Sequence, residues 1–256
     1  MTMPLLRCCI ILLAATLGLA TPSQAIVGGG VTNPDTIGPS VVTLIGSHGT
    51  VCTGALIAPN VVLTAGHCIA PQTSYRVLDT TTQPPRLLTA QKVARHPQFN
   101  LQTMLAHRAT ADVALLLLPA TVPSKTPASL GIPRSPVASG ARFTIAGVGV
   151  TVSGGDDGIG TIRAASLVAT GKPSQLQIRL VDPATNNTRN GLGACTGDSG
   201  APVFEDQDDH PVIIGVVSWS TGANNSAGCG GLTGVTPLTI YRDWILQIVR
   251  GWGVAM

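Results

Sequence analysis

Short apolar runs separated by turn-forming residues recur along most of this chain. Runs rich in Val, Ile, Leu and Thr cover residues 40–45, 61–64, 114–118, 143–146, 175–180 and 212–218. Strand-like runs at this spacing are typical of a β-barrel or β-sandwich. The 30 glycines and 19 prolines fit a chain with many turns, because glycine supplies positive φ angles and proline presets turn geometry. The sequence therefore predicts an all-β fold.

Two segments are expected to differ from this pattern. Residues 119–136 contain too many prolines for a central strand and are predicted to connect two halves of the fold. Residues 239–249 predict a packing helix with Thr239 as its N-cap. Four large side chains share one face of that helix: Tyr241, Trp244, Ile245 and Ile248.

The first 25 residues have the features of a secretory signal peptide. Arg7 supplies the positive start, residues 8–20 the apolar stretch, and Ser23-Gln24-Ala25 a small-x-small cleavage site. A membrane anchor is the alternative, but the apolar stretch is shorter than the roughly 20 residues that span a bilayer. We therefore expect a secreted protein, extracellular or periplasmic, with no stable membrane anchor. The remaining residues suffice for one enzyme-sized unit or two small barrels.

The cysteines after residue 25 predict disulfides. There are four of them, an even number in a chain that is expected to be exported, and three pairings can form: Cys52, Cys68, Cys195 and Cys229. A zinc site is the alternative for clustered Cys and His, but the chain has no Cys-x-x-Cys spacing and His67 is needed elsewhere. We expect no metal and no cofactor.

Charge and aromatic content exclude one class of partner. Lys and Arg total 15 against 12 Asp and Glu residues, without a basic run, and only 3% of residues are aromatic. Nucleic-acid binding requires a basic patch or aromatic stacking platforms. We therefore expect no nucleic-acid partner.

Three separated residues supply the groups of a nucleophilic hydrolase. Ser199 lies in Gly197-Asp198-Ser199-Gly200, His67 lies in a glycine-containing turn, and Asp112 precedes the apolar run 113–118. A serine hydroxyl needs an imidazole to take its proton, and a carboxylate fixes the tautomer of that imidazole. Each residue alone has a simpler explanation, as a turn serine, a half-buried histidine or a paired carboxylate. Together they predict catalysis by His67, Asp112 and Ser199.

The order His, Asp, Ser distinguishes this arrangement from subtilisins and α/β-hydrolases. With Ile26-Val27-Gly28-Gly29 and the segments 95–100, 217–219 and 233–235, it resembles the trypsin/chymotrypsin family of serine proteases over nearly all of the chain after residue 25. The resemblance implies two antiparallel six-stranded β-barrels with the active site between them and a C-terminal α-helix. It places the N-terminal barrel, with the histidine and aspartate, in residues 26–135 and the C-terminal barrel, with the serine, in 136–256.

The resemblance also assigns structural roles. It pairs Cys52 with Cys68 and Cys195 with Cys229. The backbone N–H groups of Gly197 and Ser199 become the oxyanion hole. Two family disulfides are absent and Val148 replaces a usual tryptophan, departures that resemble a microbial member.

An activation pair is a further implication. In the family, the carboxylate that corresponds to Asp198 pairs with a new α-amino group, which here would be that of Ile26. Signal-peptide cleavage after Ala25 would release this amine directly. Cleavage after Ala20 is the competing hypothesis, and it would leave residues 21–25 as a propeptide that needs a second cut.

The resemblance places Gly193 at the floor of the substrate pocket, where trypsin-like members carry an acidic residue. Without a carboxylate there, a buried Lys or Arg side chain of a substrate would be unpaired. We expect a preference for a neutral, small-to-medium apolar residue before the cut. The complete set of expected pocket residues is Gly193, Ala194, Thr196, Ser218, Trp219, Ser220 and Gly234.

These features predict a secreted, monomeric serine endopeptidase that forms an acyl-enzyme. Its expected partners are protein or peptide substrates and protein inhibitors. The alternative is a non-catalytic binding or adhesion protein with a protease-like fold, although such a protein is expected to lose a triad residue and this chain has lost none. Ester hydrolysis is a third hypothesis, since the same chemistry serves both. The other histidines are expected to be solvated or to cap backbone groups: His48, His96, His107 and His210.

Overall fold

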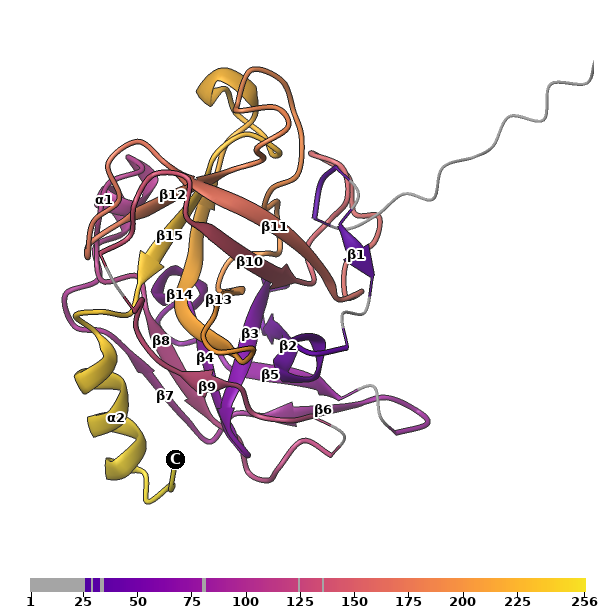
Figure 1. The fold of residues 1–256 in the computed structure, drawn as a ribbon. Coiled ribbons are helices and arrows are strands. Elements are labelled where there is room, and N and C mark those ends of the chain that lie inside the picture. The colour runs from indigo at the N-terminus through magenta and orange to yellow at the C-terminus, as the bar shows by residue number, and fades with distance from the viewer. Residues whose placement is uncertain (1–25, 29, 33–34, 80–81, 124, 135) are drawn as a thin grey trace, which may run out of the picture.

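The computed structural model describes residues 26–28, 30–32, 35–79, 82–123, 125–134 and 136–256. The predicted signal peptide, residues 1–25, lies outside the described residues. Two curled antiparallel sheets form the two halves of the molecule, and helix α2 lies along one side (Figure 1). Within the described part of the chain, no helix is long and apolar enough to cross a membrane. The predicted all-β fold is confirmed.

The first sheet is built from the first half of the chain. In spatial order its strands are β6 (Arg86–Thr89), β5 (Tyr75–Asp79), β2 (Val41–Gly46), β3 (Val51–Ala58), β4 (Val61–Thr64), β8 (Ala114–Leu117) and β7 (Lys92–Arg95). Between β6 and β7, Ala90 N–H donates to Tyr75 O at 2.8 Å and Gln91 N–H donates to Leu117 O at 2.7 Å. One bent segment, residues 86–95, therefore joins both edges of the sheet and closes it as a barrel of six strands.

The second sheet also closes. Its order is β1 (Val31–Thr32), β11 (Arg163–Thr170), β10 (Arg142–Gly147), β13 (Pro202–Asp206), β14 (Pro211–Ser220), β15 (Thr233–Pro237) and β12 (Ile178–Val181), and β12 also pairs with β11. The ring β10 to β15 is thus a six-stranded barrel, as the resemblance implied. Two short strands, β1 and β9 (Ser129–Leu130), add to this sheet although they precede residue 136. The segment 119–136 contains no strand except β9 among its described residues.

Three large apolar clusters form most of the core. One fills each barrel, and the third lies between them. This third cluster combines Leu63 and Leu115 of the first sheet with Phe204 and Val216 of the second, and with Ile245 of the C-terminal helix. Because burial of apolar surface is the main favourable term in folding, this shared cluster fixes the relative position of the two sheets and of the cleft between them.

The C-terminal helix α2 (Arg242–Gly251) begins later than predicted. Its N-cap is Tyr241 and not Thr239, and no side chain caps the helix, because residues 238–241 form a turn in which Tyr241 N–H donates to Leu238 O at 3.0 Å. The predicted apolar face is confirmed: Tyr241 and Ile245 are buried, and Trp244 and Ile248 pack against the same cluster. His96 contacts Tyr241 and Trp244 edge-on.

One predicted strand is shorter than its apolar run. Residues 175–177 are not in a strand, and β12 covers only Ile178–Val181. The Ser174 hydroxyl accepts hydrogen bonds from the backbone N–H groups of Leu176 and Gln177 at 3.2 and 3.1 Å. Such local bonding offers the backbone an alternative to the sheet ladder, so the chain turns here before the strand begins. The remaining helices are α1 (Leu101–Leu105) and the 3₁₀ turns Gly38–Ser40, Gly66–Cys68 and Ala223–Asn225.

Candidate active site

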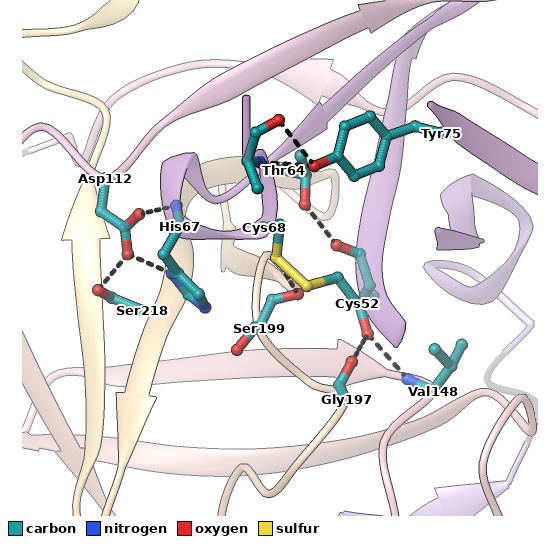
Figure 2. The surroundings of a disulfide bond; sticks show 12 residues. Cys52, Thr64, His67, Cys68, Tyr75, Asp112, Val148, Gly197, Ser199 and Ser218 are labelled. Atoms are coloured by element: carbon teal, nitrogen blue, oxygen red, sulfur yellow. Dashed lines mark hydrogen bonds and ion pairs between the residues drawn. A yellow bond between two sulfur atoms is a disulfide. The ribbon is translucent and has the colours of Figure 1, made fainter. Parts of the chain in front are cut away.

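His67 lies in the 3₁₀ turn Gly66–Cys68, directly after β4. The disulfide between Cys52 and Cys68 ties this turn to β3, with the two Cα atoms 6.3 Å apart (Figure 2). The ring Nδ1 of His67 is 2.8 Å from Asp112 Oδ2, and the His67 backbone N–H donates to Asp112 Oδ1 at 2.8 Å. Both the backbone and the ring of this histidine are thus held by one carboxylate.

Asp112 lies just before β8 and is completely buried. Its Oδ2 accepts a further hydrogen bond from Ser218 Oγ at 2.5 Å. Three donors, two from His67 and one from Ser218, therefore compensate the desolvation of this carboxylate. Because an ionised carboxylate only accepts hydrogen bonds, Nδ1 carries the imidazole proton and Nε2 is left as an acceptor.

Ser199 comes from the second half of the molecule. It lies in the loop of residues 196–201 between the disulfide-bonded Cys195 and β13, which we call the serine loop. Ser199 is half-buried, and its carbonyl oxygen lies 3.6 Å from Sγ of Cys68, the residue that follows His67 (Figure 2). Within the described part of the chain, its hydroxyl has no hydrogen-bond partner. Catalytic hydrogen bonds are often long without substrate and tighten when it binds.

Contacts with both sheets fix the serine loop. Thr53 N–H of β3 donates to Ser199 O at 2.8 Å, and the Thr53 hydroxyl donates to Gly197 O at 2.8 Å. From the other side, Gly200 N–H donates to Val217 O at 2.8 Å. The loop therefore lies at the junction of the two sheets, next to the elements that carry His67 and Asp112.

Close packing around this loop makes Gly200 a sensitive position. Its φ is +81°, and a Cβ there would lie 2.1 Å from Thr64 Oγ1 and 2.4 Å from Thr53 O. We expect Gly200→Ala to lower the free energy of unfolding by about 3 kcal/mol, from overpacking and backbone strain together. Urea denaturation measures this change. Gly140→Ala is the control, because Gly140 has φ +87° and open space around it, so that this variant should lose only about 1 kcal/mol through backbone strain. Equal losses of unfolding free energy in the two variants would contradict the packing argument.

Asp198, beside the serine, is also completely buried. Its carboxylate accepts hydrogen bonds from the backbone N–H groups of Gly149 at 2.8 Å and Cys195 at 2.9 Å. Burial raises the pKa of Asp198 to about 7, against the opposing effects of these two hydrogen bonds and of the nearby Arg163 charge. The carboxylate has no ion-pair partner among the described residues.

The N-terminal segment lies against the same region. Ile26 is completely buried in an apolar cluster that also holds Ala194 and Ala201, which flank Asp198 in the sequence. Gly193 N–H donates to Val27 O at 3.3 Å. The segment that would carry the released amine is therefore packed beside the serine loop.

The expected pocket residues have mixed surroundings. Gly193 and Ala194 are buried, and a Cβ on Gly193 would lie 3.1 Å from Gly230 Cα. Thr196 is exposed. Ser218 turns its hydroxyl to Asp112, and a Cβ on Gly234 would lie 2.0 Å from Cε2 of Trp219, so the indole covers this glycine.

The second disulfide, between Cys195 and Cys229, ties the serine loop to the segment after β14, with Cα atoms 4.9 Å apart. A family model described as Trypsin matches residues 26–245. The chain belongs to the trypsin family. It is therefore a serine-type endopeptidase, and both disulfides follow the pairing that the family resemblance implied.

Relatives agree with this assignment along most of the chain. Cationic trypsin-3 of Rattus norvegicus is 28% identical over 92% of this chain and 94% of its own length. Trypsin of Sus scrofa is 29% identical over 88% of this chain and 95% of its own. Among solved structures, human heparin binding protein matches with a TM-score of 0.68 at 23% identity, covering 88% of this chain and 97% of that one. The last similarity supports the trypsin-family fold.

The sequence did not predict several side-chain contacts in this trypsin-family site. Ser218 was expected only as a pocket wall, and Arg163 had no expected role near Asp198. His107 is exposed, in line with the expectation that it is solvated, and its ring also stacks on Trp219 with centroids 4.4 Å apart. These contacts join strands and loops that are distant in sequence, so no local pattern indicates them.

One cluster could be mistaken for a metal site. Ligand-type atoms of Cys52, His67 and Cys68 lie within 4.8 Å of one another. Both sulfur atoms are joined in the disulfide, and His67 already bonds to Asp112 through Nδ1. Since a disulfide provides no thiolate ligand, this cluster is explained by the family architecture.

Proposed function

We propose that this chain is an exported serine endopeptidase in which Ser199 is the nucleophile, His67 the general base and Asp112 the residue that orients the histidine. The observation that carries the proposal is the His67–Asp112 pair, which makes two 2.8 Å contacts with one buried carboxylate. Ser199 lies beside this pair, with its carbonyl oxygen 3.6 Å from Cys68 Sγ. His67 Nε2 takes the hydroxyl proton as Ser199 Oγ attacks the substrate carbonyl. It then returns this proton to the leaving amine, which yields an acyl-enzyme that water hydrolyses.

The developing oxyanion would be stabilised by the N–H groups of Gly197 and Ser199. Among the described residues neither N–H has an acceptor, so both are available to a substrate. Gly197 adopts φ +93°, and a Cβ there would lie 2.9 Å from Gly149 Cα. Donors fixed in this way need no reorganisation during the reaction, and each is worth about 2.7–4 kcal/mol in other proteases.

We also propose that processing before Ile26 supplies a cation to Asp198. In the intact chain the Ile26 nitrogen is an amide, and the buried carboxylate lacks a paired cation among the described residues. Cleavage after Ala25 would release an ammonium group, with a pKa near 8 in an unperturbed peptide, in the segment packed beside the serine loop. Attraction between the two charges would order that loop around Ser199 and Gly197.

This proposal predicts a pH effect on stability. The pKa of Asp198 is about 7 in the intact fold and near the usual aspartate value of 3.8 when the chain is unfolded, so the folded chain binds more protons between these values. Its free energy of unfolding is therefore expected to fall as pH rises from about 4 to 7. The chain that begins at Ile26 should lack this loss, because the ammonium group lowers the pKa of Asp198.

Urea denaturation of both forms across this pH range measures the effect. Asp198→Asn in the intact chain is the control. This substitution should remove the contribution of the Asp198 carboxylate to the pH dependence of the unfolding free energy. Parallel stability curves for the intact and processed chains would contradict the pairing.

The pocket favours a small or medium neutral side chain before the cut. Its expected floor at Gly193 lies against Gly230, and the indole of Trp219 covers Gly234. No expected pocket residue is acidic, so a bound lysine would bury an unpaired charge.

Peptide amides that differ only in the residue before the cut test this preference. The matched pair is Met and Lys, which have similar length and differ in charge. We expect kcat/KM for Met, and for Ala, Val and Leu, to exceed that for Lys by about a hundredfold or more. Faster cleavage after Lys would contradict the proposed specificity while leaving the catalytic residues in place.

The alternative drawn from the sequence, a non-catalytic binding protein, is disfavoured. The solved structure of human heparin binding protein has this fold, so the architecture alone does not imply turnover. The complete set of His67, Asp112 and Ser199, with the first two already paired, favours the endopeptidase.

A further inference from the structure

A row of three residues crosses neighbouring strands at one end of the second barrel. Arg179 of β12 pairs with Gly234 of β15, which pairs with Trp219 of β14. Because Gly234 has no Cβ, the Trp219 indole lies across β15, and the Arg179 guanidinium carbon is 5.9 Å from the indole ring. An arginine at this distance from an indole is held by a cation–π attraction.

His107 covers the same indole. Its ring stacks on Trp219 with a centroid distance of 4.4 Å and an interplanar angle of 15°. The Gln177 amide joins the two loops by donating from Nε2 to His107 O at 3.3 Å. Trp219 is only 8% exposed, and its Nε1–H has no acceptor among the described residues. The stack of His107 therefore fixes a largely buried indole at this end of the barrel.

Next to this stack is a hollow of about 460 Å³ between the loop after α1 and the loop before β12. Lys172 and Arg179 line it together with Gln177, Ser174 and Ala109, and none of its lining residues is acidic. Within the described part of the chain, neither cation has an ion-pair partner. The hollow thus combines two uncompensated positive charges with polar groups and an adjacent aromatic surface.

Its place in the fold connects it to the catalytic residues. Trp219 directly follows Ser218, whose hydroxyl donates to the Asp112 carboxylate. His107 lies on the segment that leads from α1 to Asp112. A peptide whose scissile carbonyl lies at Ser199, with its preceding side chain at Ser218–Ser220, would continue past Trp219 toward the hollow.

We propose that Lys172 and Arg179, beside the Trp219–His107 stack, form a subsite that selects an acidic side chain two to four residues before the scissile bond. This inference rests on the proposed function and names the substrate class of the same site: neutral at the cut and acidic upstream of it. Both cations are at the surface, so the attraction is screened by solvent and salt, and it acts on selectivity more than on catalysis.

Paired peptides with Glu or Gln at each of these three positions test the subsite with the processed protein. At low ionic strength, kcat/KM is expected to be about two- to fivefold higher for Glu at one position or more. The ratio should fall toward one in about 0.5 M salt. In the double variant Lys172→Gln with Arg179→Gln the ratio should also be near one, whereas Arg250→Gln, which removes an exposed charge on α2, should keep it.

The possible outcomes distinguish a failure of the subsite from a failure of the proposed endopeptidase function. Equal rates for Glu and Gln, with hydrolysis of both, overturn the subsite and leave the proposed endopeptidase intact. A preference for Glu that survives in the double variant also overturns it, since another part of the protein would then supply the charge. Failure of the processed protein to cleave any peptide overturns the proposed function and the subsite together.

Discussion

Replacing Ser199 with alanine is expected to lower kcat for peptide hydrolysis by about 10⁵- to 10⁶-fold. The variant keeps the His67–Asp112 pair, whose hydrogen bonds do not involve the serine hydroxyl, but it has no group that can form the acyl-enzyme. Some acceleration over water should remain, because the oxyanion donors and the binding surface are unchanged. Initial rates on a neutral peptide amide measure the loss.

Ser129→Ala is the matched control for this substitution. Ser129 is exposed on the short strand β9 and should be replaced without loss of activity. The Ser199 variant should unfold at the same denaturant concentration as the parent, since its hydroxyl bonds to no described residue. Activity within tenfold of the parent in the folded Ser199→Ala variant would mean that another group is the nucleophile.

Replacing Asp112 with asparagine is expected to lower kcat/KM by about 10⁴-fold. Asp112 accepts hydrogen bonds from the His67 backbone, from His67 Nδ1 and from Ser218 Oγ. An amide at this buried position has only one oxygen, and its NH₂ group would face a partner that must also donate. The histidine would then favour the tautomer with its proton on Nε2, which cannot accept the proton of Ser199.

Ser218→Ala provides a graded comparison for the aspartate. It removes one of the three donors to the carboxylate and leaves both His67 contacts, so a loss of about tenfold in kcat/KM is expected. Similar losses in the two variants would contradict the argument from tautomers. They would indicate that the carboxylate contributes mainly as an acceptor for Ser218.

Much of the fold could be predicted, and the candidate catalytic residues could be proposed, because their signals are local. Strands such as β4 and β14 follow directly from short apolar runs between turns. The triad candidates were found from residue type and order. The predicted start of α2, with Thr239 as N-cap, was wrong. A backbone turn at residues 238–241, and not a side-chain cap, precedes the helix.

The surroundings of Trp219 could not be predicted in the same way. The contact with Arg179 depends on the register of β12, β15 and β14, and the stack with His107 depends on how a loop of the first half meets the second sheet. The pairing of Ser218 with Asp112 joins residues 106 positions apart. Such contacts follow from barrel closure, which a sequence pattern with a period of two residues does not specify.

Covalent labelling of the protein that begins at Ile26 shows directly whether Ser199 is an activated nucleophile. A serine-directed phosphonate with an apolar recognition group should add its mass to Ser199 and to no other serine, and the Ser199→Ala variant should remain unlabelled. This result would show an activated nucleophile beside a formed pocket, as the geometry of His67, Asp112 and Ser199 predicts. A folded protein that takes up no label would contradict the account and favour the non-catalytic binding protein.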